Sequence, residues 1–295
     1  MSIFYSIFGF GRKGIMRILC AMLGGTIASS CISGTIKLGE SSFAVDYLTK
    51  NFPGHEFVFP KFKQYSSEDA TPDIYRESLR RIVNEIKACA FDGILITHGT
   101  DTCAFFAQLA ARVLSAVDLP YVITGAMRSP DVDPEEATGN LDHAVTCLEK
   151  GMSGVVFRNK EGRRQLYKAH LIMSPDINGI YSEYEEGIDI EKKDYSEFLS
   201  NISLPRILMI PAVPGAVYSA VDYDRVIICC NHSGTASSKL EMFVRIRTLE
   251  GIPCFMAPVP AGGGVYESRK RLRDAGAVEL PGTPIEGAWA EVLLR

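Results

Sequence analysis

The sequence predicts an α/β protein with a larger N-terminal domain built on a mainly parallel sheet and a smaller C-terminal α/β domain. Strand-like apolar runs alternate with helix-like runs as far as about residue 185. The alternation stops in a polar, charged stretch and restarts at Arg206. A length of 295 residues also favours two domains over one. We therefore expect an N-terminal α/β domain over residues 16–185, a linker over 186–204 and a C-terminal α/β domain over 205–295.

In the first domain, strands are expected at residues 17–22, 55–61, 93–97, 121–124 and 154–157. The helices between them are expected at 42–51, from 71 onward, at 101–116 and at 139–150. The second of these has the clearest signals. Thr71 can cap it, Pro72 suits its first turn, and Leu79, Ile82 and Val83 begin one apolar face that Ile86 completes.

In the second domain, strands are expected at residues 206–210, 226–230 and 253–257, with helices between them. A final helix is predicted because Ile285, Ala288, Trp289 and Val292 share one face. The basic run from Arg269 to Arg273 is interpreted as a solvated helix face.

Composition excludes several classes of function. The net charge of −4 gives no general attraction to nucleic acid or to an anionic membrane, so neither is expected as a partner. The eight cysteines lack the spacing and histidine partners of a zinc site. We expect them to be reduced and buried in a cytoplasmic protein without a metal. The apolar run in residues 1–15 is short for a signal segment and too short to span a bilayer. The first expected strand begins at Arg17, so residues 1–15 are expected to form a poorly ordered extension.

Two polar loops carry the chemistry. The run Leu23-Gly24-Gly25-Thr26-Ile27-Ala28-Ser29 follows the first expected strand, and His98-Gly99-Thr100-Asp101-Thr102 follows the third. Loops at the carboxyl ends of parallel strands are where such sheets bind ligands. Alternatives remain open for each: Thr26 could bond its own backbone, and Thr100 or Asp101 could simply cap the next helix.

These two loops, with Gly125-Ala126-Met127-Arg128 after the next strand, resemble the bacterial-type L-asparaginase and glutaminase-asparaginase family. The resemblance covers nearly the whole chain from Met16 and implies hydrolysis of L-asparagine to L-aspartate and ammonia without any cofactor. It implies Thr26 as the nucleophile that forms an acyl-enzyme. Thr100, Asp101 and Lys168 resemble a second, triad-like group, and the alternative for Lys168 is a solvated lysine.

The resemblance also implies a substrate-binding set. Ser67-Glu68-Asp69 matches a family segment that holds the α-carboxylate and α-ammonium groups. Glu68 and Asp101 would pair with the ammonium, while Ser67 and the N–H groups of the Gly25 and Gly99 loops would hold the carboxylate. The glutamate is typical of members that also accept L-glutamine.

A further family feature concerns assembly. Asn231 and Ser233 follow a strand in the region with which one family subunit closes the site of its partner. A homodimer or homotetramer is therefore expected.

Three departures from the family pattern keep other functions open. Leu23 stands where the family usually has threonine, residues 29–42 contain no tyrosine, and residues 231–235 replace a glycine-rich run. One alternative is a subunit that releases ammonia for a partner acting on aminoacyl-tRNA, although such subunits usually carry an extra N-terminal domain. Another is an amino-acid-binding protein that has lost turnover.

Overall fold

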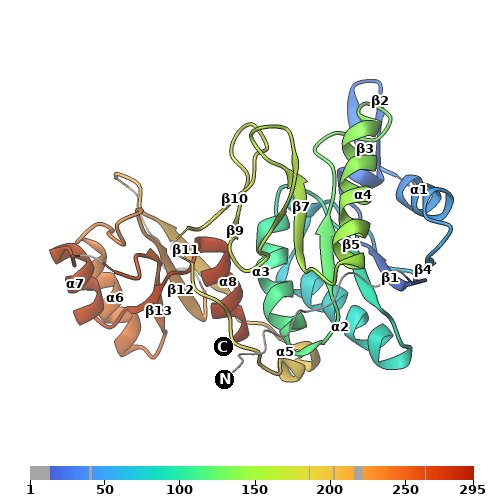
Figure 1. The fold of residues 1–295 in the computed structure, drawn as a ribbon. Coiled ribbons are helices and arrows are strands. Elements are labelled where there is room, and N and C mark those ends of the chain that lie inside the picture. Colours follow the sequence, from blue (N-terminus) through green and yellow to red (C-terminus); the bar gives the residue numbers. More distant parts are fainter. Residues whose placement is uncertain (1–13, 40–41, 186, 202, 216–221, 263) are drawn as a thin grey trace, which may run out of the picture. The chain divides into compact units, whose positions relative to one another are not determined.

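The computed structural model describes residues 14–295 except 40–41, 186, 202, 216–221 and 263 (Figure 1). Most of the expected N-terminal extension lies outside the described residues. The chain divides into two compact units that interleave in sequence. The first comprises the residues up to Asp69, Arg81–Thr100 and Val117–Leu166, and the second comprises Ala70–Arg80, Asp101–Ala116 and Tyr167–Arg295. The domain bounds expected from the sequence stay a prediction.

The first unit is built on the expected mainly parallel sheet. Its strand order is β4-β1-β5-β6-β7-β8, and the four pairings from β4 to β7 are all parallel. The central strands β5 and β6 are buried along their whole length, as is usual for parallel strands covered on both faces. The strands are β1 (Arg17–Met22), β4 (Glu56–Val58), β5 (Gly93–Thr97), β6 (Tyr121–Thr124), β7 (Gly154–Arg158) and β8 (Arg164–Tyr167).

Two helices cover one face of this sheet. Helix α4 (Pro134–Glu149) packs against β5, β6 and β7, and it also contacts α1 (Phe43–Asn51) (Figure 1). The core beneath them joins Ile18 and Cys20 of β1 to Leu48 of α1 and Leu141 of α4. The sequence placed the start of α4 near residue 139. The helix begins five residues earlier, because Pro134 is suited to the first helical position and the Asp133 side chain caps the helix.

A β-hairpin replaces the loop that was expected after Thr26. Strands β2 (Ser29–Ile32) and β3 (Thr35–Leu38) pair antiparallel, with Ile32 opposite Thr35. The connecting residues Ser33 and Gly34 have φ of 52° and 77°. Positive φ at both positions is the signature of the two-residue turn that best joins twisted strands.

The second unit contains a four-stranded parallel sheet with the order β11-β12-β13-β14. One face packs on α6 and α7 through Leu240, Val244 and Leu272, and the other packs on α8 through Ala288 and Val292. Figure 1 shows α8 apart from α6 and α7. The elements of this layer are β11 (Ile207–Pro211), β12 (Arg225–Cys229), α6 (Leu240–Leu249), β13 (Cys254–Val259), α7 (Glu267–Asp274), β14 (Val278–Pro281) and α8 (Ile285–Leu294).

The second unit has further elements outside this sheet. Helix α3 (Cys103–Val113) packs on α8, and a two-stranded ribbon joins β9 (Ile172–Met173) to β10 (Ser182–Glu183). The expected linker contains a short helix, α5 (Ser196–Ser200). Helix α2 (Pro72–Ala88) runs from the second unit's residues into those of the first. Single 3-10 turns lie at η1 (Thr26–Ala28), η2 (Ser67–Asp69) and η3 (Leu114–Ala116).

The basic run on α7 is only partly the solvated face that was expected. Arg269 is buried, and its guanidinium donates two 2.9 Å hydrogen bonds to the Glu279 carboxylate. Leu272 is fully buried in the core. The expectation was wrong at these two positions, because a partner carboxylate on β14 makes the burial of an arginine tolerable.

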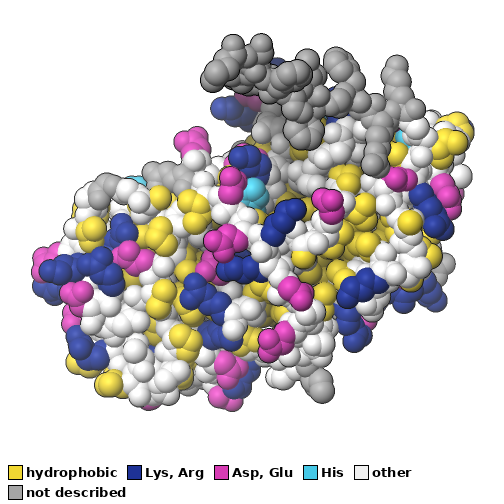
Figure 2. All heavy atoms as spheres, turned by 60° about the horizontal axis from the view of Figure 1, so that its bottom comes forward, with side chains coloured by type: hydrophobic (Ala, Val, Ile, Leu, Met, Phe, Trp, Pro, Cys, Tyr) yellow, Lys and Arg dark blue, Asp and Glu magenta, His cyan; other side chains and the backbone are white. Residues whose placement is uncertain are grey.

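Surface charges of both signs lie interspersed on the face drawn in Figure 2, with hydrophobic side chains between them. All eight cysteines are free thiols. Five are buried, whereas Cys31 and Cys229 are half-buried and Cys89 is exposed, so the expectation of burial holds for most of them only.

Candidate functional site

The two threonine-bearing loops leave neighbouring strands at the same edge of the first unit's sheet. Strands β1 and β5 run parallel, and their last residues, Met22 and Thr97, are in register. The Leu23 N–H then donates to the Thr97 carbonyl at 3.1 Å. The two loops therefore begin side by side, at the edge where open parallel sheets bind ligands.

Gly25 and Gly99 bring these loops into backbone contact. A Cβ on Gly25 would fall 2.3 Å from both the Cα and the N of Gly99. A Cβ on Gly99 would fall 2.5 Å from the Ser67 Oγ. Only glycine allows backbones to approach this closely. Three candidate residues from three separate loops, Gly25, Ser67 and Gly99, thus lie together.

Thr26 follows Gly25 and begins the turn η1 with its side chain half-buried. The turn is closed by other groups: the Ser29 hydroxyl and the Ala28 N–H both donate to the Gly25 carbonyl, at 3.0 and 2.9 Å. Among the described residues, the Thr26 hydroxyl has no hydrogen-bond partner. The alternative in which Thr26 bonds its own backbone is therefore not seen in this turn, and the hydroxyl is left for another partner.

Ser67 and Glu68 differ in exposure. Ser67 is buried against the Gly99 backbone, whereas the next side chain, Glu68, is exposed. The segment is joined to the first loop by the Tyr65 N–H, which donates to the Leu23 carbonyl at 3.1 Å. The Ser67 hydroxyl thus lies against the Gly99 loop, whereas the Glu68 carboxylate is exposed to solvent.

His98 is a buried neutral imidazole that supports the second loop. Burial lowers the pKa of His98 to about 4, although its hydrogen bond to the Gly99 carbonyl opposes the shift. The ring nitrogen Nδ1 donates to that carbonyl at 2.7 Å, which assigns the proton to Nδ1 at neutral pH. The Tyr65 ring meets it edge-on, with centroids 5.5 Å apart. His98 therefore fixes the backbone next to Thr100.

Within the second threonine loop, Thr100 is the last residue assigned to the first unit and Asp101 is the first residue of the next segment of the second unit. Thr100 is buried and Asp101 is exposed. The residue at the cap position of α3 is Thr102, and its side chain makes no capping hydrogen bond. Thr102 instead receives the Tyr75 hydroxyl at 2.5 Å. The residue at the cap position of α3 is thus Thr102, and neither Thr100 nor Asp101.

Lys168 belongs to the second unit and is exposed in the turn between β8 and β9. Its backbone N–H donates to the Glu183 carboxylate, and its carbonyl accepts from the Leu171 N–H at 3.0 Å. Within the described part of the chain its ammonium group forms no ion pair. The backbone is thus held firmly while the side chain stays available.

Asn231 and Ser233 lie in the loop after β12 and bond within it. The Asn231 amide donates to the Thr235 carbonyl at 3.2 Å, and the Ser233 and Thr235 hydroxyls are 3.0 Å apart. Asn231 is exposed and Ser233 is half-buried. These bonds shape the loop, and the exposed amide keeps hydrogen-bonding capacity for a further contact.

Two residues that the sequence analysis missed hold the loop after β6. The Glu136 carboxylate accepts the N–H groups of Met127 and Arg128, and the Asn140 amide donates to the Gly125 carbonyl at 2.9 Å. A signal was present: Asp133 at the cap and Glu136 three residues later have the spacing of a capping box. That spacing would have started α4 early enough to include both residues.

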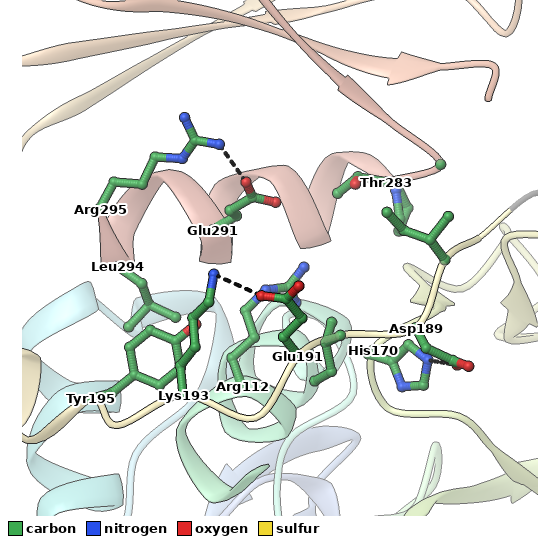
Figure 3. A pocket seen from close by; sticks show the side chains of 14 residues that line it. Arg112, His170, Asp189, Glu191, Lys193, Tyr195, Thr283, Glu291, Leu294 and Arg295 are labelled. Atoms are coloured by element: carbon green, nitrogen blue, oxygen red, sulfur yellow. Dashed lines mark hydrogen bonds and ion pairs between the residues drawn. The ribbon is translucent and has the colours of Figure 1, made fainter. Parts of the chain in front are cut away.

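A cavity of about 480 Å³ lies within the second unit (Figure 3). Its lining comes from α3, from His170, from residues 188–195 and from residues 282–295, which include α8, and it includes none of the ten candidate residues. The charged side chains that Figure 3 draws are partly paired with each other across this lining. The pairs are Lys193–Glu191 at 3.4 Å, His170–Asp189 at 3.2 Å and Arg295–Glu291 at 2.6 Å.

The described residues contain no cluster of three or more His, Cys, Asp or Glu side chains able to hold a metal ion. Nor does the described chain contain a helix that is both long and apolar enough to cross a membrane.

Comparison with solved structures identifies the fold. The thermostable L-asparaginase from Thermococcus kodakarensis superposes with a TM-score of 0.71 at 21% identity, covering 95% of this chain and 92% of that one. L-asparaginase I from Vibrio cholerae gives the same TM-score and coverage at 18% identity. Both support the two-domain α/β architecture expected from the sequence.

Curated relatives extend the comparison. A glutamyl-tRNA(Gln) amidotransferase subunit from Methanosarcina mazei is 32% identical, with 96% of this chain and 74% of that protein covered. The corresponding protein of Methanosphaera stadtmanae is 24% identical, and this chain spans 59% of its length. The family model of the asparaginase N-terminal region matches residues 17–170, which include both threonine loops. By this match and the fold, the chain belongs to the asparaginase family.

Proposed function

We propose that this protein hydrolyses the side-chain amide of L-asparagine, releasing ammonia, with L-glutamine as a second substrate. The observation that carries the proposal is the close contact between Gly25, Gly99 and Ser67. Thr26 follows Gly25 in the sequence, and its hydroxyl has no hydrogen-bond partner among the described residues. Membership of the asparaginase family supports an amide hydrolase.

In this proposal the Thr26 Oγ attacks the amide carbon of the substrate. A base passes the Thr26 hydroxyl proton to the departing amide nitrogen, the C–N bond breaks and ammonia leaves. Water then hydrolyses the acyl-enzyme, which releases the carboxylic acid and restores the hydroxyl. Loop N–H groups stabilise the negative charge that develops on the carbonyl oxygen. Lys168, through Thr100, serves as the base that a weakly acidic hydroxyl needs. Glu68 and Asp101 bind the α-ammonium group, and Ser67 binds the α-carboxylate.

Ammonia release by the purified protein tests this proposal. Thr26→Ala should lower kcat by roughly 10³-fold or more, because the nucleophile is removed. Thr49→Ala is the matched control, since that exposed hydroxyl bonds the Val45 carbonyl within α1. Release from neither amide by the wild-type protein, with tight amino-acid binding by calorimetry, would instead indicate a binding protein without turnover.

A second candidate function is favoured by the relatives. The Methanosarcina and Methanosphaera proteins are both parts of glutamyl-tRNA(Gln) amidotransferases. Under this alternative the same threonine site releases ammonia for a partner enzyme. The distinguishing measurement is amidase activity with and without candidate partner proteins, together with amidation of glutamyl-tRNA(Gln). Full activity of the isolated protein favours the asparaginase function, and activity only in the complex favours the amidotransferase.

Assembly is part of the leading proposal. The exposed Asn231 amide and the Ser233 hydroxyl are proposed to help close the site of a partner copy in a homodimer or homotetramer. Light scattering and the activity of Asn231→Ala test this together. A fully active monomer would contradict it.

A further inference from the structure

The loop formed by Gly125, Ala126, Met127 and Arg128 lies against the second threonine loop of the first unit. A Cβ on Gly125 would fall 2.4 Å from the His98 carbonyl oxygen. The His98 N–H donates to the Thr124 carbonyl at 2.9 Å, immediately before this loop. Ala126 is fully buried. A shift of the 125–128 loop would therefore be transmitted directly to the backbone that precedes Gly99 and Thr100.

Helix α4 holds this loop at both ends. The two oxygens of the Glu136 carboxylate accept the Met127 N–H at 3.2 Å and the Arg128 N–H at 3.1 Å. Asn140 lies one turn later on the same helix face and donates to the Gly125 carbonyl at 2.9 Å. Both side chains are buried. The loop is thus bonded to the helix through three of its backbone groups.

The chemistry of this contact requires a carboxylate. Each oxygen of Glu136 faces a backbone donor, so a glutamine would turn its own N–H₂ group towards one of them. Among the described residues Glu136 forms no ion pair, although it is only 4% exposed. Its charge is therefore compensated by backbone N–H groups and by its place in the first turn of α4, where the helix dipole favours an anion.

Helix α4 is itself held in place at its N-terminus and along the sheet. The Asp133 carboxylate caps it by accepting the Glu136 N–H at 3.0 Å, and α4 packs along β5, β6 and β7. The sheet thus fixes α4, α4 fixes the 125–128 loop, and this loop fixes the backbone of His98. A buried polar cluster of this kind fixes one arrangement rather than several.

We propose that Glu136 and Asn140 are positioning residues for the amide hydrolysis, acting through the 125–128 loop on the Gly99–Thr100 backbone. The inference rests on the proposed function. Misplacement of a catalytic group by about 1 Å can cost on the order of 100-fold in rate. We expect Glu136→Gln to lower kcat by roughly 10- to 100-fold while KM changes much less.

The test compares Glu136→Gln and Asn140→Ala with Glu135→Gln, which alters the neighbouring side chain that is 83% exposed. Steady-state kcat and KM are measured well below the melting temperature of every variant, with amide hydrogen exchange of Met127 and Arg128 as the second readout. We expect faster exchange at both amides and a lower kcat in Glu136→Gln, and no change in Glu135→Gln.

Each outcome decides the inference. A folded Glu136→Gln variant with wild-type kcat overturns it, whatever happens to the melting temperature, because a merely structural role moves only the latter. If Glu136→Gln does not fold, Asn140→Ala decides, since it removes a single bond, and an unchanged kcat again overturns the inference. A wild-type protein that releases no ammonia from either amide refutes the proposed function instead.

Discussion

The Cα of Gly99 occupies the space that any side chain on Gly25 would need, with 2.3 Å between it and an ideal Gly25 Cβ. Gly25 also has φ of +79°, a conformation that residues with a Cβ rarely adopt. Gly25→Ala should therefore both strain the turn and force the two threonine loops apart. We expect a loss of about 3 kcal/mol or more in the free energy of unfolding and a loss of amidase activity, measured by denaturant titration and ammonia release.

Gly34→Ala separates the two causes of that loss. Gly34 has a similar φ of +77°, but an added Cβ would meet no atom within 4 Å. Gly34→Ala should lower the free energy of unfolding only through the strain of a positive φ in a residue with a Cβ, which is about 1–2 kcal/mol. Equal losses for the two variants would mean that the contact between the loops contributes nothing.

The parallel sheet of the first unit was predictable because its strands are continuous apolar runs, such as 17–22, whose burial on both faces needs no knowledge of partners. The hairpin of residues 29–38 was not, because Ile32 and Ile36 are exposed and its pairing depends on the positive φ of Ser33 and Gly34. Short elements of this kind give no burial pattern from which to infer pairing.

The candidate site was predictable in part for a similar reason. Two glycine-bearing loops after adjacent parallel strands must start at one edge, so the contact of Gly25 with Gly99 follows from topology. The roles of Glu136 and Arg269 depend on which backbone or side chain lies opposite them. Such long-range partners cannot be deduced from local spacing.

His98 should make stability depend on acidity. Its pKa is about 4 in the folded protein and about 6.5 when exposed, so the unfolded chain binds more protons between these values. The stabilising contribution is complete above pH 6.5 and is lost as the pH falls towards 4. The full loss is about 3 kcal/mol.

Denaturant unfolding between pH 7 and pH 4 measures this effect. His98→Asn removes the titrating group while leaving an amide that can donate to the Gly99 carbonyl. We expect its stability to fall less steeply over this range than that of the wild type. Parallel curves for the two proteins would show that His98 is not the group responsible.

Asp131 ties the hairpin after Thr26 to the loop between β6 and α4. Its carboxylate accepts the Cys31 N–H at 2.8 Å, one hundred residues away in sequence. The Ser129 hydroxyl and, to a smaller extent, this bond hold the pKa of Asp131 below its usual value, so the contact persists in mild acid. Asp131→Ala should release β2 and raise the exchange rate of the Cys31 amide several-fold, measured by hydrogen exchange.

Asp131→Asn is the informative comparison, because its Oδ1 can still accept the same N–H group. We expect exchange close to that of the wild type in this variant. Faster exchange in Asn and Ala variants alike would mean that charge, rather than the acceptor, holds the hairpin.

The pair formed by Arg269 and Glu279 should stabilise the second unit. Their side chains are 8% and 15% exposed, and removing one partner would leave the other charge buried without compensation. Glu279→Gln should cost about 2–3 kcal/mol in the free energy of unfolding. Glu267→Gln, which breaks the exposed pair with Arg271 on the same helix, should leave stability unchanged within error. Similar losses in both variants would contradict the role of burial.

Ser67 and Gly99 should be energetically coupled. Gly99 does not have a left-handed φ, so an alanine there is opposed only by its surroundings, with the Ser67 Oγ and Cβ at 2.5 and 2.6 Å. Ser67→Gly removes both atoms, and the double variant should therefore be more stable than the sum of the two single losses predicts. We expect a coupling of about 1–2 kcal/mol in a double-mutant cycle followed by denaturant unfolding. Additive losses would mean that the loop carrying Ser67 moves aside freely, and the close contact of the three loops would then not constrain the position of Thr26.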